Sequence, residues 1–108
     1  MAISTDVLDF SAGNYTPTPL SNNRQLSAVF ESNQKKAEEA LSETSDEFLQ
    51  NSWTMKNGDQ IYFTITKEEV IRMSMSQTIH HRAQLGVFLR LLDIPIPGSY
   101  GPSADEAF

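Results

Sequence analysis

The sequence predicts an all-α protein, a helix bundle that carries one small β-hairpin. Apolar residues recur at steps of three and four over residues 22–42 and again over residues 67–92, which is the spacing of helices with an apolar face. Between these segments, residues 52–65 alternate apolar and polar side chains around an Asn-Gly pair, the pattern of a hairpin. The helical patterns cover more of the chain than the alternating one, so helices are expected to dominate the fold.

Composition and charge restrict the function classes. The chain has 108 residues, enough for one domain. It carries 14 Asp and Glu against 8 Lys and Arg, a formal net charge of −6, which argues against non-specific binding of nucleic acid or anionic lipid. Without cysteine there is no disulfide framework and no thiolate, and no apolar run is long enough to span a membrane. We therefore expect a cytoplasmic protein without a nucleic-acid or membrane partner.

Residues 1–22 are expected to form a connector, because Gly13 and two prolines interrupt any helix or central strand. A helix over residues 22–42 follows, with Ser21 or Asn22 as its N-terminal cap. Its apolar stripe should be buried, and its charged opposite face should be solvated.

A single further helical turn, capped by Thr44 or Ser45, precedes the hairpin of residues 52–65. Asn57-Gly58 is expected at the two central positions of its turn, since both residues tolerate a positive φ. Two strands alone are marginally stable, so the hairpin should pack against another element. Trp53 is expected to be its buried anchor rather than a ligand-stacking side chain.

Residues 67–92 form the strongest predicted helix, roughly 39 Å long. Thr66 and Glu69 fit a capping box, in which each side chain accepts a hydrogen bond from the backbone amide of the other residue. One face carries the residues expected to point inward: Val70, Ser74, Gln77, His81, Leu85, Phe88 and Leu92. Gly86 is expected to allow close approach of a neighbouring helix, and residues 93–108 should form an extended tail with turns.

The long helix is apolar around much of its circumference, so more than one element should cover it. One other long helix and a hairpin are too few to do so. Either the chain self-associates as a homodimer, or further helices of the same domain are missing from this sequence.

Candidate chemistry is concentrated in the middle of the long helix. His80 and His81 are adjacent and point about 100° apart, so both cannot hold one metal ion from one face. Four residues before His81 stands Gln77, a poor ligand for zinc-like ions. The residues alone favour His81 as a hydrogen-bonded core histidine beside Ser74 and Gln77, with a metal ligand as the alternative.

Neighbouring polar residues extend this region without completing a site. Arg82 and Gln84 should reach flanking helices or the tail, and for Arg82 an ion pair is expected, although the sequence does not identify its partner. The glycines form neither a P-loop nor a dinucleotide-binding motif, and no serine occupies a Gly-x-Ser-x-Gly motif. The residues themselves therefore indicate no complete catalytic or metal site.

Two segments near the C-terminus resemble a known family. The first contains His80-His81-Arg82-Ala83-Gln84, and the second reads Tyr-Gly-Pro-Ser-Ala-Asp-Glu over residues 100–106. Further similarity extends over three short segments: residues 5–10, 15–17 and 53–55. Together these segments resemble the DinB-like (damage-inducible protein DinB) family, which includes the YfiT-like metalloenzymes.

This resemblance implies a four-helix bundle, commonly dimeric, with nickel or zinc held by three histidines. It implies a metal-dependent enzyme of the thiol S-transferase or hydrolase type, acting on a small-molecule thiol or another small substrate. The chain would be the C-terminal two-thirds of one such domain, a four-helix-bundle fragment without the first helix and part of the second.

By the same resemblance, His81 matches one metal ligand, while Gln77 stands at the position of its partner, so the metal site is incomplete in this chain. The side chains that would line this site are Ser74, Gln77, His80, Arg82 and Gln84. The alternative is a non-catalytic bundle that acts through dimerisation or by binding a small molecule. Gln77 favours the alternative, whereas the match around His81 favours the enzyme.

Overall fold

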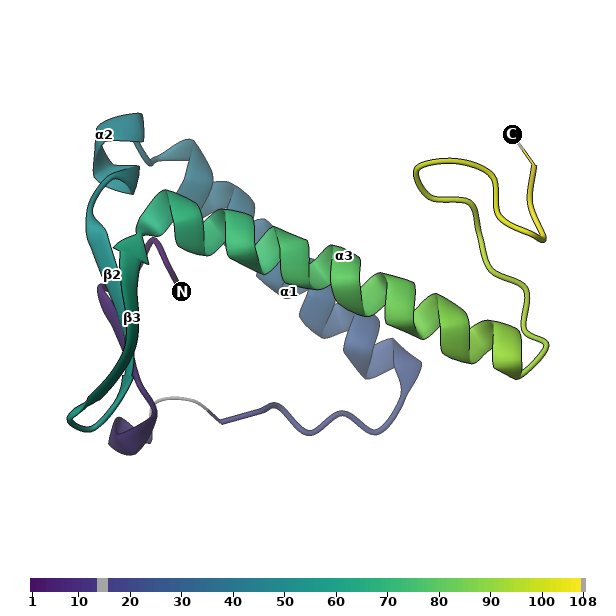
Figure 1. Cartoon of the computed structure of the whole chain (residues 1–108), viewed down its shortest axis with the longest axis horizontal. Coiled ribbons are helices and arrows are strands. Elements are labelled where there is room, and N and C mark those ends of the chain that lie inside the picture. Colours follow the sequence, from purple (N-terminus) through teal and green to yellow (C-terminus); the bar gives the residue numbers. More distant parts are fainter. Residues whose placement is uncertain (14–15, 108) are drawn as a thin grey trace. The chain divides into compact units, whose positions relative to one another are not determined.

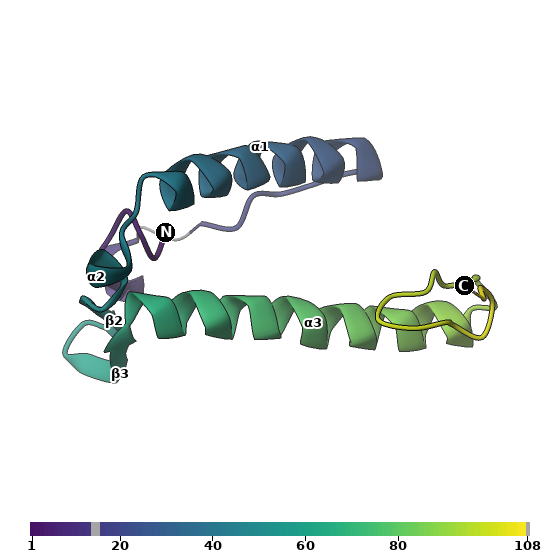
Figure 2. The same cartoon turned by 90° about the horizontal axis from the view of Figure 1, so that it is seen from above.

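The computed structural model describes residues 1–13 and 16–107, which form two units along the chain (Figure 1). The N-terminal unit runs from Met1 to Ile71, and the C-terminal unit begins at Arg72. The elements follow in this order: β1 (Val7–Asp9), the 3-10 turn η1 (Phe10–Ala12), α1 (Asn23–Ser42), α2 (Asp46–Leu49), β2 (Ser52–Asn57), β3 (Gln60–Thr66) and α3 (Lys67–Leu91). The helix α3 is continuous, and its first turn belongs to the N-terminal unit (Figure 2).

The prediction of an all-α four-helix bundle is wrong. The described residues contain three α-helices and a three-stranded sheet in the order β1-β2-β3. The predicted hairpin is present as the antiparallel pair β2 and β3, with Trp53 opposite Ile65. The third strand, β1, pairs in parallel with β2 and places Leu8 opposite Met55. The protein is therefore a mixed α and β structure.

The third strand comes from the segment that was expected to be a connector. Residues 7–9 are too short to show a period of their own, and they become a strand only by pairing with β2. The backbone amide of Thr54 donates to the Asp6 carbonyl at 2.9 Å, which extends this pairing by one step. Because the partner strand lies more than forty residues further along the chain, nothing in the local sequence indicates the pairing.

The hydrophobic core of the N-terminal unit lies where the sheet meets the first turn of α3. Trp53 is 2% exposed and packs with Leu8 from β1 and Val70 from α3. The Phe63 ring lies 6.3 Å from the Trp53 ring between centroids. The indole Nε1 donates to the Thr5 hydroxyl at 3.3 Å, so the polar atom of this buried side chain is satisfied. The prediction that Trp53 anchors the hairpin is confirmed.

The helix α1 begins where its cap predicts, but its expected buried stripe is not found. Asn22 accepts a hydrogen bond from the Gln25 amide at 3.0 Å, and the following turn, α2, is capped by Ser45 in the same way. Among the described residues of α1, none is buried. Leu26 and Phe30, two members of the apolar stripe, are exposed. Local signals therefore predict that this helix forms, but they do not predict whether its apolar stripe is buried.

The turn of the hairpin lies one residue later than predicted. Asn57 pairs with Gln60, so Gly58 and Asp59 occupy the two central positions. Gly58 has a φ of 60°, while Asp59 is not among the residues of positive φ. A positive φ at the first central position alone matches a type II′ turn, in which glycine is preferred there.

Both ends of α3 are closed by specific hydrogen bonds. The predicted capping box is confirmed: Thr66 Oγ1 accepts from the Glu69 amide at 3.2 Å, and Glu69 Oε2 accepts from the Thr66 amide at 2.9 Å. At the other end, the amides of Asp93 and Ile94 donate to the carbonyls of Arg90 and Leu89. With Asp93 at a φ of 55°, this is a Schellman motif in which aspartate takes the usual glycine position.

Among the described residues, none of the helices combines the length and the apolar composition that a membrane span requires.

Asp9 joins β1 to the hairpin turn. Its carboxylate accepts from the Gly58 amide at 3.0 Å and from the Ser11 hydroxyl at 2.7 Å, and Lys56 Nζ lies 3.4 Å away. The Gly58 amide, followed by the Ser11 hydroxyl, lowers the pKa of Asp9 from 3.8 to about 2, because both donate to the charged form.

This lowered pKa predicts an acid-dependent loss of stability. The stabilisation by the Asp9 carboxylate should be fully present above pH 3.8 and should be lost as the pH falls toward about 2. In an NMR titration, the Asp9 carboxyl carbon is expected to titrate near 2, and the difference in stability between the wild type and Asp9→Asn should shrink over the same interval. Titration of Asp9 at 3.8 would contradict the arrangement.

Candidate functional site: a groove between α3 and the tail

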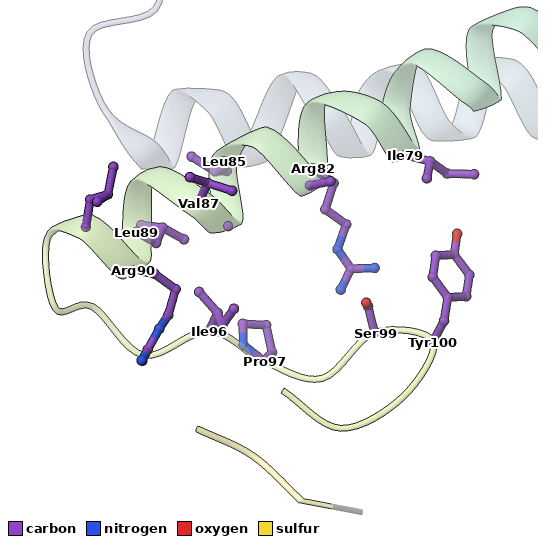
Figure 3. Close-up of a pocket in the computed structure, with 13 residues that line it drawn as sticks. Ile79, Arg82, Leu85, Val87, Leu89, Arg90, Ile96, Pro97, Ser99 and Tyr100 are labelled. Carbon is purple, nitrogen blue, oxygen red and sulfur yellow. The ribbon is translucent and has the colours of Figure 1, made fainter. Parts of the chain in front are cut away.

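The C-terminal unit contains a groove of about 730 Å³ between the second half of α3 and the tail that follows it (Figure 3). One wall comes from the helix, where Gly86 lies under the Ile96 side chain. The other wall comes from the tail. Most lining residues are apolar, and they include Ile79, Leu85, Val87, Leu89, Leu91, Ile96 and Pro97. The volume lies within the range of small-molecule sites, roughly 300–1,000 Å³.

The tail is held in place by carboxylates near the end of the chain. Arg90 Nη1 donates to Asp105 Oδ1 at 2.6 Å, and Asp105 Oδ2 accepts from the Ile96 amide at 3.0 Å. Glu106 accepts from the Gly98 amide at 2.7 Å, and the Ser103 hydroxyl donates to the Ile96 carbonyl at 2.7 Å. Ile96 takes part in two of these bonds, so contacts within the tail position the groove wall that it forms.

The two cations of the groove differ in their partners. Arg90 is paired with Asp105 and serves to hold the tail. Arg82 extends from α3 toward Ser99, with Tyr100 at the same end of the groove (Figure 3). Within the described part of the chain, Arg82 has no ion pair or hydrogen bond, so the ion pair expected for it from the sequence is not found.

The other residues predicted for a site do not line the groove. The side chains expected on one inward face are exposed beyond the first turn of α3, and only Val70 of that face is buried. His81 is exposed, and its Nδ1 lies 3.2 Å from the Gln84 amide oxygen, so the interpretation of His81 as a buried core histidine is wrong. The His80 ring stands edge-on to that of His81, 5.3 Å away between centroids. Ser74 and Gln77 are exposed as well.

The metal site that the family resemblance implies needs three histidine ligands held close together. Within residues 1–13 and 16–107, no group of three or more histidine, aspartate or glutamate side chains comes together. The one hydrogen-bonded neighbour of His81 is an amide side chain, Gln84, and not a second metal ligand. We therefore derive no chemical step through a metal ion.

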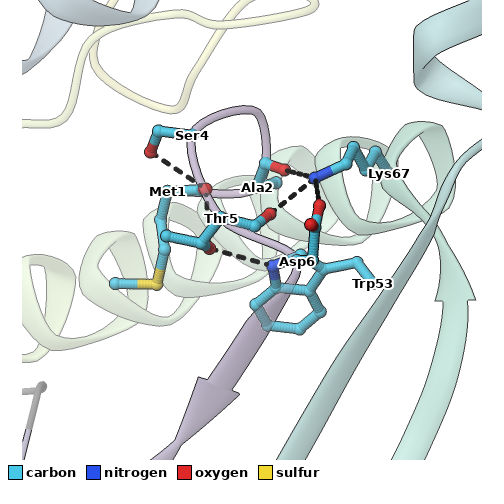
Figure 4. Close-up of polar contacts among 7 residues, drawn as sticks. All are labelled: Met1, Ala2, Ser4, Thr5, Asp6, Trp53 and Lys67. Atoms are coloured by element: carbon cyan, nitrogen blue, oxygen red, sulfur yellow. Dashed lines mark hydrogen bonds and ion pairs between the residues drawn. The ribbon is translucent and has the colours of Figure 1, made fainter.

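A second polar cluster lies in the N-terminal unit, around the fully buried Lys67 (Figure 4). Its Nζ donates to the carbonyls of Ala2 and Thr5, at 3.0 and 2.5 Å, and pairs with the Asp6 carboxylate at 2.7 Å. The three N–H groups of the ammonium thus have three acceptors, and the Phe48 ring centroid lies 5.2 Å away. No donor remains for a ligand, so this cluster ties residues 2–6 to α3.

Comparison with family models, with curated protein sequences and with solved structures finds no match for this chain. The resemblance to the DinB-like family therefore stays a sequence-based prediction. The fold and the groove define the protein only by class: a small mixed α and β chain with an open, mostly apolar groove in its C-terminal unit.

Arg82 was predicted from the sequence as a site-lining residue, but the groove that it lines was not predicted. The missed residues on the tail, Ile96, Pro97 and Ser99, carry no motif of their own. The available signal was the run of residues 100–106. Its Asp105 pairs with Arg90 of α3, while its Ser103 and Glu106 bind Ile96 and Gly98 within the tail.

Proposed function

We propose that this chain is a small-molecule-binding module, and that the groove between α3 and the tail is its binding site. The observation that carries this proposal is the 730 Å³ groove with largely apolar walls. Such walls favour an apolar ligand, since its burial would release water from both surfaces. This function corresponds to the non-catalytic alternative in the sequence analysis, without the bundle architecture.

The hydrogen bonds of the tail support a preformed site. Ser103, Asp105 and Glu106 make four bonds to the tail and to Arg90, and we expect these bonds to hold the groove in shape without a ligand. A ligand entering a preformed groove does not have to order the segment that contacts it, and this lowers the free-energy cost of binding.

Enzymatic activity, a metal cofactor and a homodimer stay predictions from the sequence alone.

A groove-filling variant tests this function. A Cβ atom at Gly86 would meet Ile96 Cδ1 at 4.0 Å, an ordinary van der Waals contact, so Gly86→Leu should fit sterically at its first atom and fill the groove beyond it. Leucine also has a higher helix propensity than glycine, so α3 should not be weakened. We expect the affinity for the neutral dye Nile red, measured by fluorescence titration, to fall about tenfold, or about 1.4 kcal/mol.

The control for this test is Phe88→Ala on the same helix. Phe88 is 63% exposed and does not line the groove, so trimming it should leave Nile red binding unchanged. Loss of binding in Phe88→Ala with normal binding in Gly86→Leu would place the dye on another face of α3 and would overturn the proposal. Absence of Nile red binding to the wild-type chain would overturn it as well.

A further inference from the structure

We infer that the ligand of this groove is an amphipathic carboxylate, an aliphatic acid whose charged end pairs with Arg82 while its chain lies along the apolar walls. This inference rests on the proposed function, because it names the chemical class of ligand for the same groove. It adds a specific recognition residue and a preference for one charge.

The polar end of the groove is formed by Arg82, Ser99 and Tyr100 (Figure 3). The guanidinium of Arg82 has no ion pair or hydrogen bond within the described residues. A guanidinium presents parallel N–H donors that match the two oxygens of a carboxylate, and hydroxyl groups beside it can donate further hydrogen bonds. Arg90, the other cation of the groove, is already neutralised by Asp105.

The rest of the groove is suited to an apolar chain. Among the described residues that line it, none is acidic, so nothing in the walls repels a carboxylate. From Arg82 to Leu91 the helix wall spans ten residues, which is about 14 Å for nine steps of 1.5 Å. Along it lie the side chains of Val87 and Leu89, with Ile96 opposite.

The net charge of the protein does not explain a preference for a carboxylate ligand. At a net charge of −6, the chain repels anions at long range, so recognition has to come from a local contact. The single unpaired guanidinium of the groove can pair with one negatively charged group. A single-headed carboxylate with an apolar body therefore fits this groove better than a polyanion.

The experiment compares octanoate with octanol, which share the length of the aliphatic chain but differ in charge. Both are titrated against Nile red bound to the folded 108-residue chain, at neutral pH and low salt. We expect octanoate to displace the dye at lower concentration than octanol. In Arg82→Gln the affinity for octanoate should fall about tenfold, since a charge-assisted pair is lost, while the affinity for octanol stays unchanged.

Two matched variants separate recognition by Arg82 from a loss of charge in general. Arg72→Gln makes the same change outside the groove, about 15 Å earlier along α3, and should leave both affinities unchanged. Arg82→Lys keeps the charge but not the paired donors, and should recover part of the octanoate affinity.

The outcomes distinguish this inference from the proposed function. If octanoate and octanol displace Nile red equally well and Arg82→Gln changes neither, the groove still binds small molecules but the carboxylate inference is overturned. If Arg72→Gln weakens octanoate as much as Arg82→Gln does, the preference comes from overall charge, and the inference is again overturned. If the wild type binds neither the dye nor the two ligands, both proposals fail.

Discussion

Replacement of Trp53 by alanine is expected to unfold the N-terminal unit. Trp53 is 2% exposed, and the only other fully apolar side chains buried among the described residues are Leu8 and Val70. Truncating a buried tryptophan costs about 3–5 kcal/mol, because transfer free energy is lost and a cavity remains. Small domains have a total stability of about 5–15 kcal/mol, so a core this small should not survive the change.

Circular dichroism and denaturant titration measure this effect. We expect Trp53→Ala to lose the sheet signal and to show no cooperative transition from the N-terminal unit. Phe30→Ala is the matched control, because it truncates an aromatic ring that is 65% exposed on α1 and should change the stability by less than about 1 kcal/mol. A Trp53→Ala protein with the unfolding midpoint of the wild type would show that the core lies elsewhere.

Replacement of Lys67 by methionine is expected to release residues 2–6 and to destabilise the unit by about 3 kcal/mol. The change keeps an apolar stem of similar length but removes the donor to the carbonyls of Ala2 and Thr5. It also removes the buried ammonium that pairs with the Asp6 carboxylate at 2.7 Å. The loss should therefore exceed that of an ordinary surface ion pair.

Asp6→Asn gives the comparison that isolates the charge. The Asp6 side chain is 79% exposed, so water already solvates its carboxylate, and Lys67 retains two carbonyl acceptors in the variant. We expect this variant to cost about 1 kcal/mol, in the range of exposed ion pairs. Hydrogen exchange of the amides of residues 4–9 should accelerate in Lys67→Met much more than in Asp6→Asn. Equal exchange rates in Lys67→Met and the wild type would contradict the role of Lys67.

The limits of the helices could be predicted because their signals are local. Asn22 and Ser45 bind amides three residues further on, and Thr66 and Glu69 bind each other across the same separation. The alternation around Trp53 is equally local, and it predicted the hairpin. The predicted turn was one residue too early. Asn57 and Gly58 both tolerate a positive φ, but the pairing of Asn57 with Gln60 places Gly58 and Asp59 at the centre of the turn.

The candidate site could be predicted only in part. A helix that is apolar around much of its circumference does not reveal which of its faces the rest of the chain will cover. The inward face was predicted to carry His81, whereas the tail lies along the face that carries Arg82 and Gly86. Since adjacent residues point about 100° apart, His81 lies outside the groove, and only Leu85 of the predicted face lines it.

By itself, the sequence determined which segments are helical, where the caps lie, that a hairpin precedes the long helix, and that Trp53 is its anchor. The first three of these features depend on residues within a few positions of one another, whereas the burial of Trp53 was expected from the general tendency of tryptophan to be buried. Only the tertiary structure decided that Val7–Asp9 is a strand, that Lys67 is buried, and that Ile96 returns to cover Gly86. These features depend on contacts between separate segments, and their free energy appears only when the chain brings those segments together.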